Sequence, residues 1–454
     1  MSAHVSEALP HAASIEAPRV TLRTVYSAWW PLAASWLLMG LEIPMVSAVL
    51  ARLPDPITSL AAYGGVVFPL ALMIEAPIIM LLSASTALSR DEPSYRLVRR
   101  YMFSASLTLT AFHALIAFTP LFDVVVAGWM HAPPEILEPS RRGLQILLPW
   151  TLSIAYRRFQ QGALIRFGRS RTIGIGTAVR LAANAAVLAI GSFATDWPGI
   201  IVGTLAVATG VVSEAIYAGI AVRPVLRELR AAPLVGEPLT PMAFARFYAP
   251  LAVMPILMFS AMPLASAAMG RMPRTVESLA AWPALNGFVF TLRSTSFSFN
   301  EVVVSLLDRP GAVPALRRFT LRLAAAVSAL ILAFAFTPLG GVWFAHVAGL
   351  DSALVSLAVL GLMLAVPLPW LSTFQSWYQG TVVHARRTRA ITDSMVVYIV
   401  VIAAVLWMGV ATQQFDGLSV AMVATVLGNL AQMMYLRMHA HSAMRTIQNH
   451  SLRA

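Results

Sequence analysis

The sequence contains no cysteine and no lysine, and it carries little charge of either sign. Without cysteine, the chain can form no disulfide and can perform no thiol chemistry. All 32 basic residues are arginine, so a P-loop, which ends in Gly-Lys-Ser or Gly-Lys-Thr, is also excluded. Charged residues make up 11% of the chain, whereas soluble domains average about 25%. The scarcity of charge is typical of an integral membrane protein.

Long apolar runs recur from residue 29 to residue 437, and 58% of all residues are hydrophobic. A helix needs about 20 apolar residues to cross a hydrocarbon core of about 30 Å, whereas the strands of membrane barrels are about half as long and alternate in polarity. We therefore predict an all-α integral membrane fold with twelve transmembrane helices. The predicted spans are 29–51, 58–88, 101–120, 143–165, 172–192, 198–222, 246–270, 276–307, 319–338, 353–379, 391–411 and 416–437.

Arginines in the short loops predict how these spans are oriented. The loops on one side hold only Arg52, Arg141, Arg142, Arg271 and Arg274, whereas those on the other side and both termini are rich in arginine. By the positive-inside rule the arginine-rich side is cytoplasmic. We therefore expect a multi-pass protein of a bacterial-type inner (plasma) membrane with both termini in the cytoplasm. This bias also explains the formal charge of +12 without nucleic-acid binding.

Short motifs recur in the same order about 219 positions apart. Trp30-Pro31-Leu32 corresponds to Ala249-Pro250-Leu251, Ser59–Tyr63 to Ser278–Trp282, and Leu148-Pro149-Trp150 to Leu368-Pro369-Trp370. Six spans return each half to the same side, so we predict two six-helix bundles related by a pseudo-twofold axis along the membrane normal. The predicted division is a cytoplasmic arm (1–26), an N-terminal bundle (27–222), a cytoplasmic linker (223–245), a C-terminal bundle (246–437) and a cytoplasmic tail (438–454).

Parallel duplication is one of the two repeat classes of transporters, whose substrate sites lie between the repeats. We therefore predict a secondary active transporter that moves a small solute by alternating access. One chain supplies both halves of the cavity, so a monomer suffices, with the solute and membrane lipids as its partners. A duplication without a transport role, a channel and a membrane-embedded enzyme are the alternatives. Neither HExxH nor a nucleophile motif occurs, so no enzyme activity is indicated.

Seven charged residues lie away from the ends of predicted spans, where a charge costs about 2.5–3.5 kcal/mol on insertion scales and is a functional hypothesis by default. Glu301 and Asp393 lie nearer the cytoplasmic helix ends, where solvation explains them. We predict a substrate or gate role for Glu75, Arg293, Arg157, Arg158 and Arg180, and an ion-coupling role for Glu42 and Glu214. The excess of arginine favours an anionic solute, because the forked donors of arginine match carboxylate and phosphate groups. The alternatives for the arginines are pairing with the buried glutamates and snorkelling to an interface.

The repeat relates Glu75 to Arg293. Arg293 corresponds to Ile74, the neighbour of Glu75, so both charges lie near the middle of the second span of their half. If these two spans face each other, Glu75 and Arg293 approach at the same depth and could form a gate or hold a substrate. A permanent salt bridge, or separate contacts within each half, is the alternative.

Glu42 is the only acidic residue of the first span and precedes Pro44 by two positions. An unpartnered carboxylate in a membrane cavity can carry a coupling proton or bind Na⁺, whereas the alternative is a hydrogen bond to a neighbouring helix. No cofactor other than such an ion is expected, and no metal site, because the histidines show no ligand spacing. Pro44 and Pro263, which the repeat matches, predict helix kinks. These kinks either aid packing or move during transport.

Three motifs, Trp29-Trp30-Pro31-Leu32, Leu60-Ala61-Ala62-Tyr63-Gly64 and Tyr248-Ala249-Pro250-Leu251, open spans 1, 2 and 7. With the two six-span halves, they resemble the multidrug/oligosaccharidyl-lipid/polysaccharide exporter superfamily, which includes MATE exporters and lipid flippases. Within it the chain is most similar to the progressive ankylosis (ANK) protein family, over roughly residues 27–437. The resemblance implies a MATE-like fold with a V-shaped cavity.

The branches of this superfamily imply different solutes. The ANK-like branch implies export of small organic anions. MATE-like members imply cation-coupled drug export through a carboxylate in span 1, here Glu42. The flippases line their cavity with arginines, as Arg157, Arg158 and Arg293 would, although some carry more than twelve spans.

Overall fold

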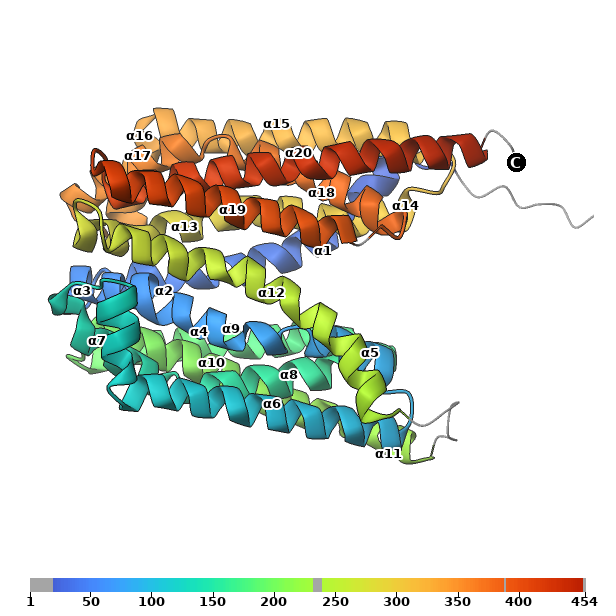
Figure 1. Cartoon of the computed structure of the whole chain (residues 1–454), viewed down its shortest axis with the longest axis horizontal. Helices are drawn as coiled ribbons and strands as arrows, with labels where there is room; N and C mark the ends of the chain where they lie inside the picture. Colours follow the sequence, from blue (N-terminus) through green and yellow to red (C-terminus); the bar gives the residue numbers. More distant parts are fainter. Residues whose placement is uncertain (1–18, 232–238, 388, 452–454) are drawn as a thin grey trace, which may run out of the picture.

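The computed structural model describes residues 19–231, 239–387 and 389–451, so parts of the predicted arm, linker and tail (1–18, 232–238, 452–454) lie outside the described residues. Every regular element in this part is a helix, and most helices run along the long axis (Figure 1). The first half contains α1 (Leu22–Gly40), α2 (Glu42–Leu50), α3 (Pro56–Ala61), η1 (Ala62–Val67), α4 (Phe68–Glu75), η2 (Ala76–Ile78), α5 (Leu81–Leu88), α6 (Glu92–Phe118), η3 (Asp123–Trp129), α7 (Pro134–Ile146), α8 (Leu148–Arg166), α9 (Arg171–Ala194), α10 (Gly199–Ala221) and α11 (Arg223–Ala231). The second half contains α12 (Pro241–Met269), α13 (Thr275–Phe297), α14 (Phe299–Leu306), α15 (Ala312–Phe336), α16 (Pro338–Val342), η4 (Trp343–Val347), α17 (Ser352–Ala365), α18 (Leu368–His384), α19 (Arg389–Thr412) and α20 (Gly417–Ser451).

The predicted all-α membrane fold is confirmed. In the described chain, nine helices or helix series are long and apolar enough to cross a membrane, and the pair α17 and α18, bent by 41°, makes a tenth. The other two predicted spans coincide with α8 and α13. Both of these helices carry arginine: Arg157 and Arg158 lie in the middle of α8, and Arg293 lies four residues before the end of α13. The two predicted spans that are not among these ten, α8 and α13, are therefore helices that carry predicted site residues.

The backbone repeats at the spacing of the sequence motifs. Asp55 and Arg274 lie 219 positions apart, and both adopt a left-handed conformation directly before α3 and α13, with φ of 54° and 57°. Thr119 and Thr337 end α6 and α15 in the same extended conformation, and each hydroxyl donates a 2.6 Å hydrogen bond to the carbonyl four residues earlier. The π-helical segments η3 and η4 follow. Equivalent local sequences thus form equivalent turns in the two halves.

The two ends of the molecule differ in their loops. The arginine-rich end, at the right of Figure 1, carries the loops 89–91, 167–170, 307–311 and 385–387. The arginine-poor end, at the left, carries the loops 51–55, 119–133, 270–274 and 337–351.

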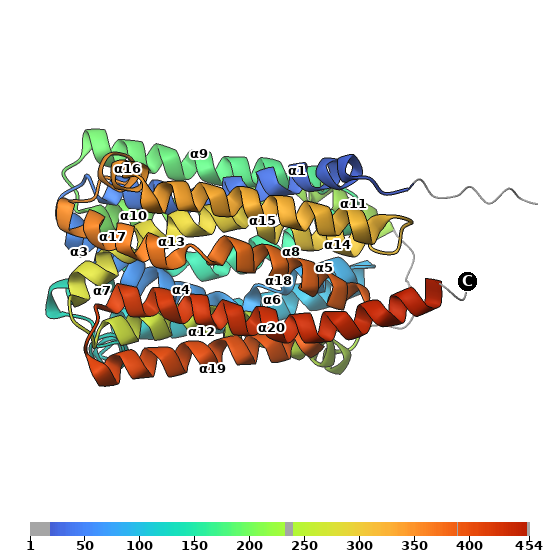
Figure 2. The same cartoon turned by 90° about the horizontal axis from the view of Figure 1, so that it is seen from above.

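The first helix of each half packs against the opposite half. Trp29 of α1 donates from Nε1 to the carbonyl of Thr295 on α13 at 2.8 Å, and α1 also contacts α14 and α15 (Figure 2). Conversely, Tyr248 of α12 donates from Oη to the carbonyl of Pro77 in η2 at 2.6 Å. Figure 1 shows α12 running obliquely between the two bodies. The division into two six-helix bundles stays a prediction, and these two helices connect the bodies.

The first span is broken at Leu41, three residues before Pro44. Pro44 has no N–H to donate to the carbonyl of Gly40, which would be its helical partner. That carbonyl instead accepts a 2.9 Å hydrogen bond from Oγ1 of Thr291 on α13. The helix break is thus stabilised by the other half of the chain. At the matched position Pro263, by contrast, α12 continues without a break.

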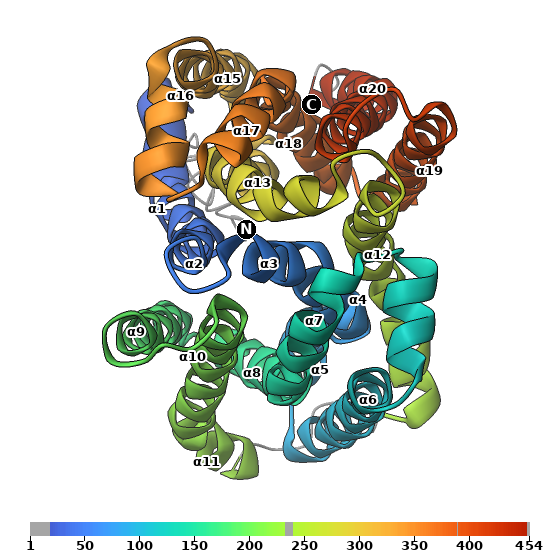
Figure 3. The same cartoon turned by 90° about the vertical axis from the view of Figure 1, so that its left-hand side faces the viewer.

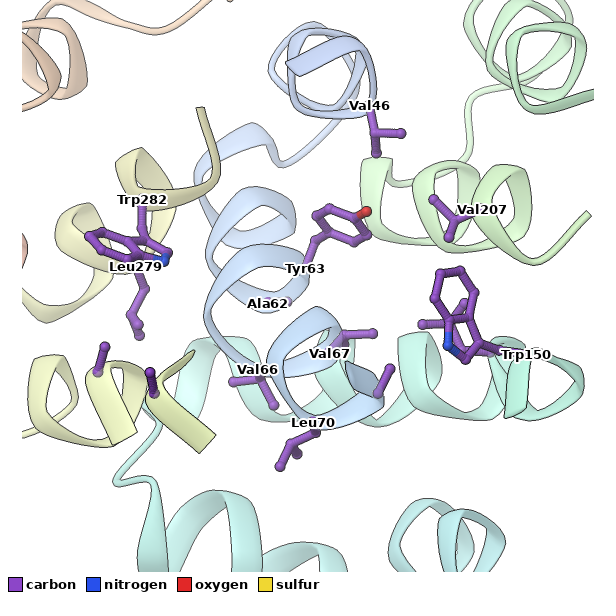
Figure 4. Close-up of a cluster of buried hydrophobic side chains, with 14 of the residues drawn as sticks. Val46, Ala62, Tyr63, Val66, Val67, Leu70, Trp150, Val207, Leu279 and Trp282 are labelled. Carbon is purple, nitrogen blue, oxygen red and sulfur yellow. The ribbon is translucent and has the colours of Figure 1, made fainter. Parts of the chain in front are cut away.

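Near the arginine-poor end the halves pack through α13, which contacts α2, α3 and η1 (Figure 3). Leu279 and Trp282 of α13 face the helix segment that carries Ala62 (Figure 4). Between them the backbones approach closely, because a β-carbon at Gly64 would lie only 2.4 Å from Cγ of Pro283. Small residues allow such close approach between membrane helices, so Gly64 sets how tightly the two halves close here.

Replacing Gly64 by alanine is expected to lower the thermal midpoint of the detergent-solubilised protein. The added methyl group meets the rigid ring of Pro283, and overpacking of this kind costs typically about 1–3 kcal/mol. The matched control is Gly174→Ala on α9, where a β-carbon meets nothing within 4 Å and alanine favours the helix by about 1 kcal/mol. Equal thermal midpoints for the two variants would show that the halves do not close on Gly64.

Candidate functional site

Four charged side chains from four helices meet inside the first half of the chain. Arg157 of α8 donates from Nη1 to Oε2 of Glu214 on α10 at 3.0 Å. Nε of Arg180 on α9 lies 3.6 Å from the same Oε2, and its Nη2 lies 3.1 Å from Oε2 of Glu42 on α2. The Glu214 side chain is 0% exposed and the other three at most 14%. Charges that are this well shielded interact much more strongly than surface pairs.

Side-chain amides complete the coordination of these carboxylates. Nε2 of Gln161 donates to Oε1 of Glu214 at 3.0 Å, and Nδ2 of Asn184 donates to Oε1 of Glu42 at 3.1 Å. Each amide follows an arginine of the cluster by four residues and therefore lies on the same helix face. Guanidinium and amide donors thus hold both carboxylates, from α8 and α9 for Glu214 and from α9 alone for Glu42.

Glu75 is the third carboxylate of this half. It is 2% exposed, ends α4 where η2 interrupts the helix, and accepts a hydrogen bond from Nε1 of Trp150. The cations whose charge acts on Glu75 are Arg157, Arg158 and Arg180, all from the same half. We define these six charged residues, Glu42, Glu75, Glu214, Arg157, Arg158 and Arg180, as the N-half charge cluster. Its three carboxylates and three guanidinium groups balance.

Arg293 lies apart from this cluster, on α13 in the second half. Its Nε donates to Oγ of Ser372 on α18 at 2.6 Å, and its Nη2 donates to Oδ1 of Asn429 on α20 at 2.8 Å. The guanidinium carbon lies 5.4 Å from the ring centroid of Phe297. In the described part of the chain, no carboxylate forms an ion pair or hydrogen bond with Arg293.

The structure does not join Glu75 to Arg293. Glu75 is bonded to Trp150 of its own half, and Arg293 to neutral partners of the other half, which is the arrangement of separate contacts within each half. Glu42 is not an unpartnered carboxylate either, because Arg180 and Asn184 bind it. Among residues 19–231, 239–387 and 389–451, no group of three His, Asp or Glu side chains could hold a metal ion. Substrate, gate and coupling roles stay predictions.

Sequence analysis missed several neutral residues of these clusters. Gln161 and Asn184 could have been found, because each lies four residues after a buried arginine on a predicted helix. Trp150 occurred only as a repeat motif. Ser372 and Asn429 could not have been found, because only tertiary packing places them beside Arg293.

Two arginines join the halves at the arginine-poor end in the same way. Arg52 donates to the carbonyls of His346 and Val347 in η4, the latter at 3.1 Å, and Arg271 donates to the carbonyl of Trp129 in η3 at 2.6 Å. Each also donates at 2.6 Å to the carbonyl four residues earlier in its own helix. Arg52 and Arg271 lie 219 positions apart, so the duplication supplies one such contact from each half. We call these two residues the arginine clasps.

No family model matches the chain, and no curated protein matches it. Solved structures do. An inward-facing MATE family multidrug resistance transporter of the MOP superfamily is 15% identical with a TM-score of 0.69, and the match covers 92% of this chain and 99% of that one. The inward closed lipid II flippase MurJ is 13% identical with a TM-score of 0.69, over 93% and 91% of the two chains.

An outward-facing MATE family transporter of the MOP superfamily is 15% identical with a TM-score of 0.57, over 94% of this chain and 97% of that one. Because the identity is so low, these matches establish the fold alone, over nearly the whole chain. They agree with the predicted MATE-like arrangement of membrane helices. The chain therefore has the membrane-spanning fold of the MATE-like transporters of the MOP superfamily.

Proposed function

We propose that this protein is a secondary active exporter that moves a small organic anion across a bacterial-type inner membrane by alternating access. The observation that carries the proposal is the way the two halves meet. The arginine clasps and the contacts of α13 with α2, α3 and η1 gather near the arginine-poor end. Toward the other end, contacts between the bodies run through α1 and α12. A molecule closed at one end and joined elsewhere by two connecting helices suits one state of an alternating-access cycle.

The positive-inside rule assigns the arginine-rich end, with both termini, to the cytoplasm. The closed, arginine-poor end then faces outward, and the structure corresponds to an inward-facing state. The greater similarity to the inward-facing than to the outward-facing MATE transporter supports this assignment. In the outward-facing state of the cycle, the arginine clasps would have to release the carbonyls of η3 and η4.

The charges favour an anion as solute. The N-half charge cluster is balanced, so the excess positive charge in the middle of the spans is that of Arg293. The resemblance to the ANK-like branch also supports an organic anion. The competing proposal of a cation-coupled drug exporter needs Glu42 to bind a cation, and in this arrangement Arg180 already neutralises Glu42. A coupling H⁺ or Na⁺ would therefore bind Glu42 or Glu214 only in a state that separates these carboxylates from their arginines.

Transport into proteoliposomes tests the proposal. We expect uptake of small organic anions such as citrate or pyrophosphate above that of protein-free liposomes, and we expect a pH or Na⁺ gradient to change it. Cationic dyes and a fluorescent anionic lipid, assayed in parallel, test the drug-exporter and flippase alternatives. Gradient-driven dye transport that stops in Glu42→Gln, or lipid movement alone, would replace the anion proposal. If nothing moves under any gradient, the transporter proposal itself fails.

A further inference from the structure

The buried charges of the two halves differ in one respect. In the first half the N-half charge cluster holds three carboxylates for its three arginines, and Arg157 and Arg180 form ion pairs with two of them. In the second half Arg293 lies in α13, four residues before that helix ends at Phe297, and its hydrogen-bonded partners are a hydroxyl and an amide. Neutral acceptors stabilise a cation but leave its full charge uncompensated. Removing a charge from water without a counter-charge costs free energy. An anion from outside the chain that binds Arg293 would supply this counter-charge.

The neutral partners of Arg293 are fixed in place. Oγ of Ser372 donates to the carbonyl of Leu368 at 2.8 Å, so its lone pairs remain for the guanidinium. Nδ2 of Asn429 donates to the carbonyl of Thr425 at 2.7 Å, which directs its Oδ1 toward the guanidinium. Ser372 is 0% and Asn429 is 4% exposed. Two buried side chains, each held by its own helix, therefore orient Arg293 in advance.

The orientation leaves donors available. A guanidinium group has five N–H donors, and the hydrogen bonds to Ser372 and Asn429 use one on Nε and one on Nη2. Within the described part of the chain, the donors of Nη1 and the second donor of Nη2 form no further hydrogen bond. Arg293 is only half-buried, so an approaching group can reach it. Parallel N–H groups of this kind bind the two oxygens of a carboxylate or phosphate.

We propose that Arg293, oriented by Ser372 and Asn429, is an oxyanion-binding site that takes the carboxylate or phosphate group of the solute. The assignment rests on the proposed function for the identity of the solute, but binding can be measured without transport. The phosphate of an anionic lipid has the same chemistry and would bind by the same donors. Arg157 and Arg180 would not compete for this group, because they already bind carboxylates of the chain.

Binding to the purified protein in an uncharged detergent tests the site. We expect citrate or pyrophosphate to raise the thermal midpoint and to give a saturable calorimetric signal. Arg293→Gln should weaken the affinity by about tenfold to a hundredfold, since hydrogen bonds to charged groups contribute about 1.5–3 kcal/mol. Arg293→Lys keeps the positive charge but loses the forked pair of donors, so its affinity should lie between those of the unchanged protein and Arg293→Gln. The matched control is Arg227→Gln, which removes an exposed arginine of α11 and should leave binding unchanged.

The ligand-free thermal midpoint shows whether Arg293→Gln is folded, and Asn429→Leu provides a second variant that disturbs only the orientation of Arg293. Unchanged affinity in Arg293→Gln overturns the site, as does a wild-type protein that binds no oxyanion. If that protein still transports another solute, the proposed function survives. If oxyanions bind through Arg293 but proteoliposomes transport nothing, the site stands and the proposed function fails. If only nanodiscs with phosphatidylglycerol raise the thermal midpoint, and only with Arg293 present, the site stands with a lipid phosphate as its ligand.

Discussion

Replacing Glu214 by alanine should destabilise the protein more than any other single substitution in the spans. Glu214 is fully buried and is the carboxylate that both Arg157 and Arg180 approach, so its removal leaves two guanidinium groups with too few acceptors. Removing one partner of a buried pair costs typically about 3–5 kcal/mol, because the remaining charge has lost its compensation. We expect a thermal midpoint lowered by many degrees in detergent, or failure to accumulate in the membrane.

The matched control is Glu138→Ala on α7. Glu138 also pairs with an arginine, Arg142, at 2.8 Å, but the two side chains are 62% and 57% exposed. Exposed pairs of this kind contribute about 0–1 kcal/mol, so the thermal midpoint should barely change. If Glu214→Ala and Glu138→Ala have the same midpoint, the N-half charge cluster does not stabilise the fold, and its residues are free for other roles.

A double variant separates lost compensation from lost packing. Arg157→Met combined with Glu214→Leu removes one charge of each sign and keeps the volume, so it should recover part of the stability that Glu214→Ala loses. Recovery would identify the unpaired charge as the cause. No recovery would indicate that Arg180 and Gln161, which also contact Glu214, depend on this carboxylate as much as Arg157 does.

The double variant Arg52→Ala with Arg271→Ala should open the arginine-poor end. Each arginine clasp donates to carbonyls of the opposite half, and charge-assisted bonds at partly exposed positions contribute roughly 1 kcal/mol each after solvent screening. The pair therefore stabilises the closed end by on the order of 2 kcal/mol, which is about thirtyfold in the equilibrium constant. The single variants should each give roughly half of the shift in free energy.

Spin-label distances measure this opening directly. Because the chain has no cysteine, two introduced cysteines are the only labelled sites. Exposed positions on the two halves at this end are Glu135 of α7 and Ser352 of α17, and the distance between their labels should lengthen in the double variant. Arg142→Ala, which breaks a pair within α7 alone, is the matched control. An unchanged distance distribution in the double variant would show that α13 alone keeps this end closed.

Sequence patterns determined the membrane class, the helical fold, the positions of the spans and the duplication. These features depend on local rules, which act on neighbouring residues. A span is an apolar run of a required length, and a turn such as that at Thr119 and Thr337 forms wherever the same short motif occurs. The sequence also predicts that Arg180 and Asn184 share a helix face, because residues four positions apart in a helix lie on the same side.

Tertiary structure decided which buried charges meet. The repeat placed Glu75 and Arg293 at equivalent depths, but depth does not determine direction around a helix axis, and packing turned the two side chains toward partners in their own halves. The same packing gave Glu42 an arginine partner, bound the carbonyl freed by Pro44 to Thr291, and set the arginine clasps against η3 and η4. Each of these contacts joins residues far apart in the chain, where a low-dielectric interior favours any arrangement that satisfies every charge. Only the folded positions of the helices select among those arrangements.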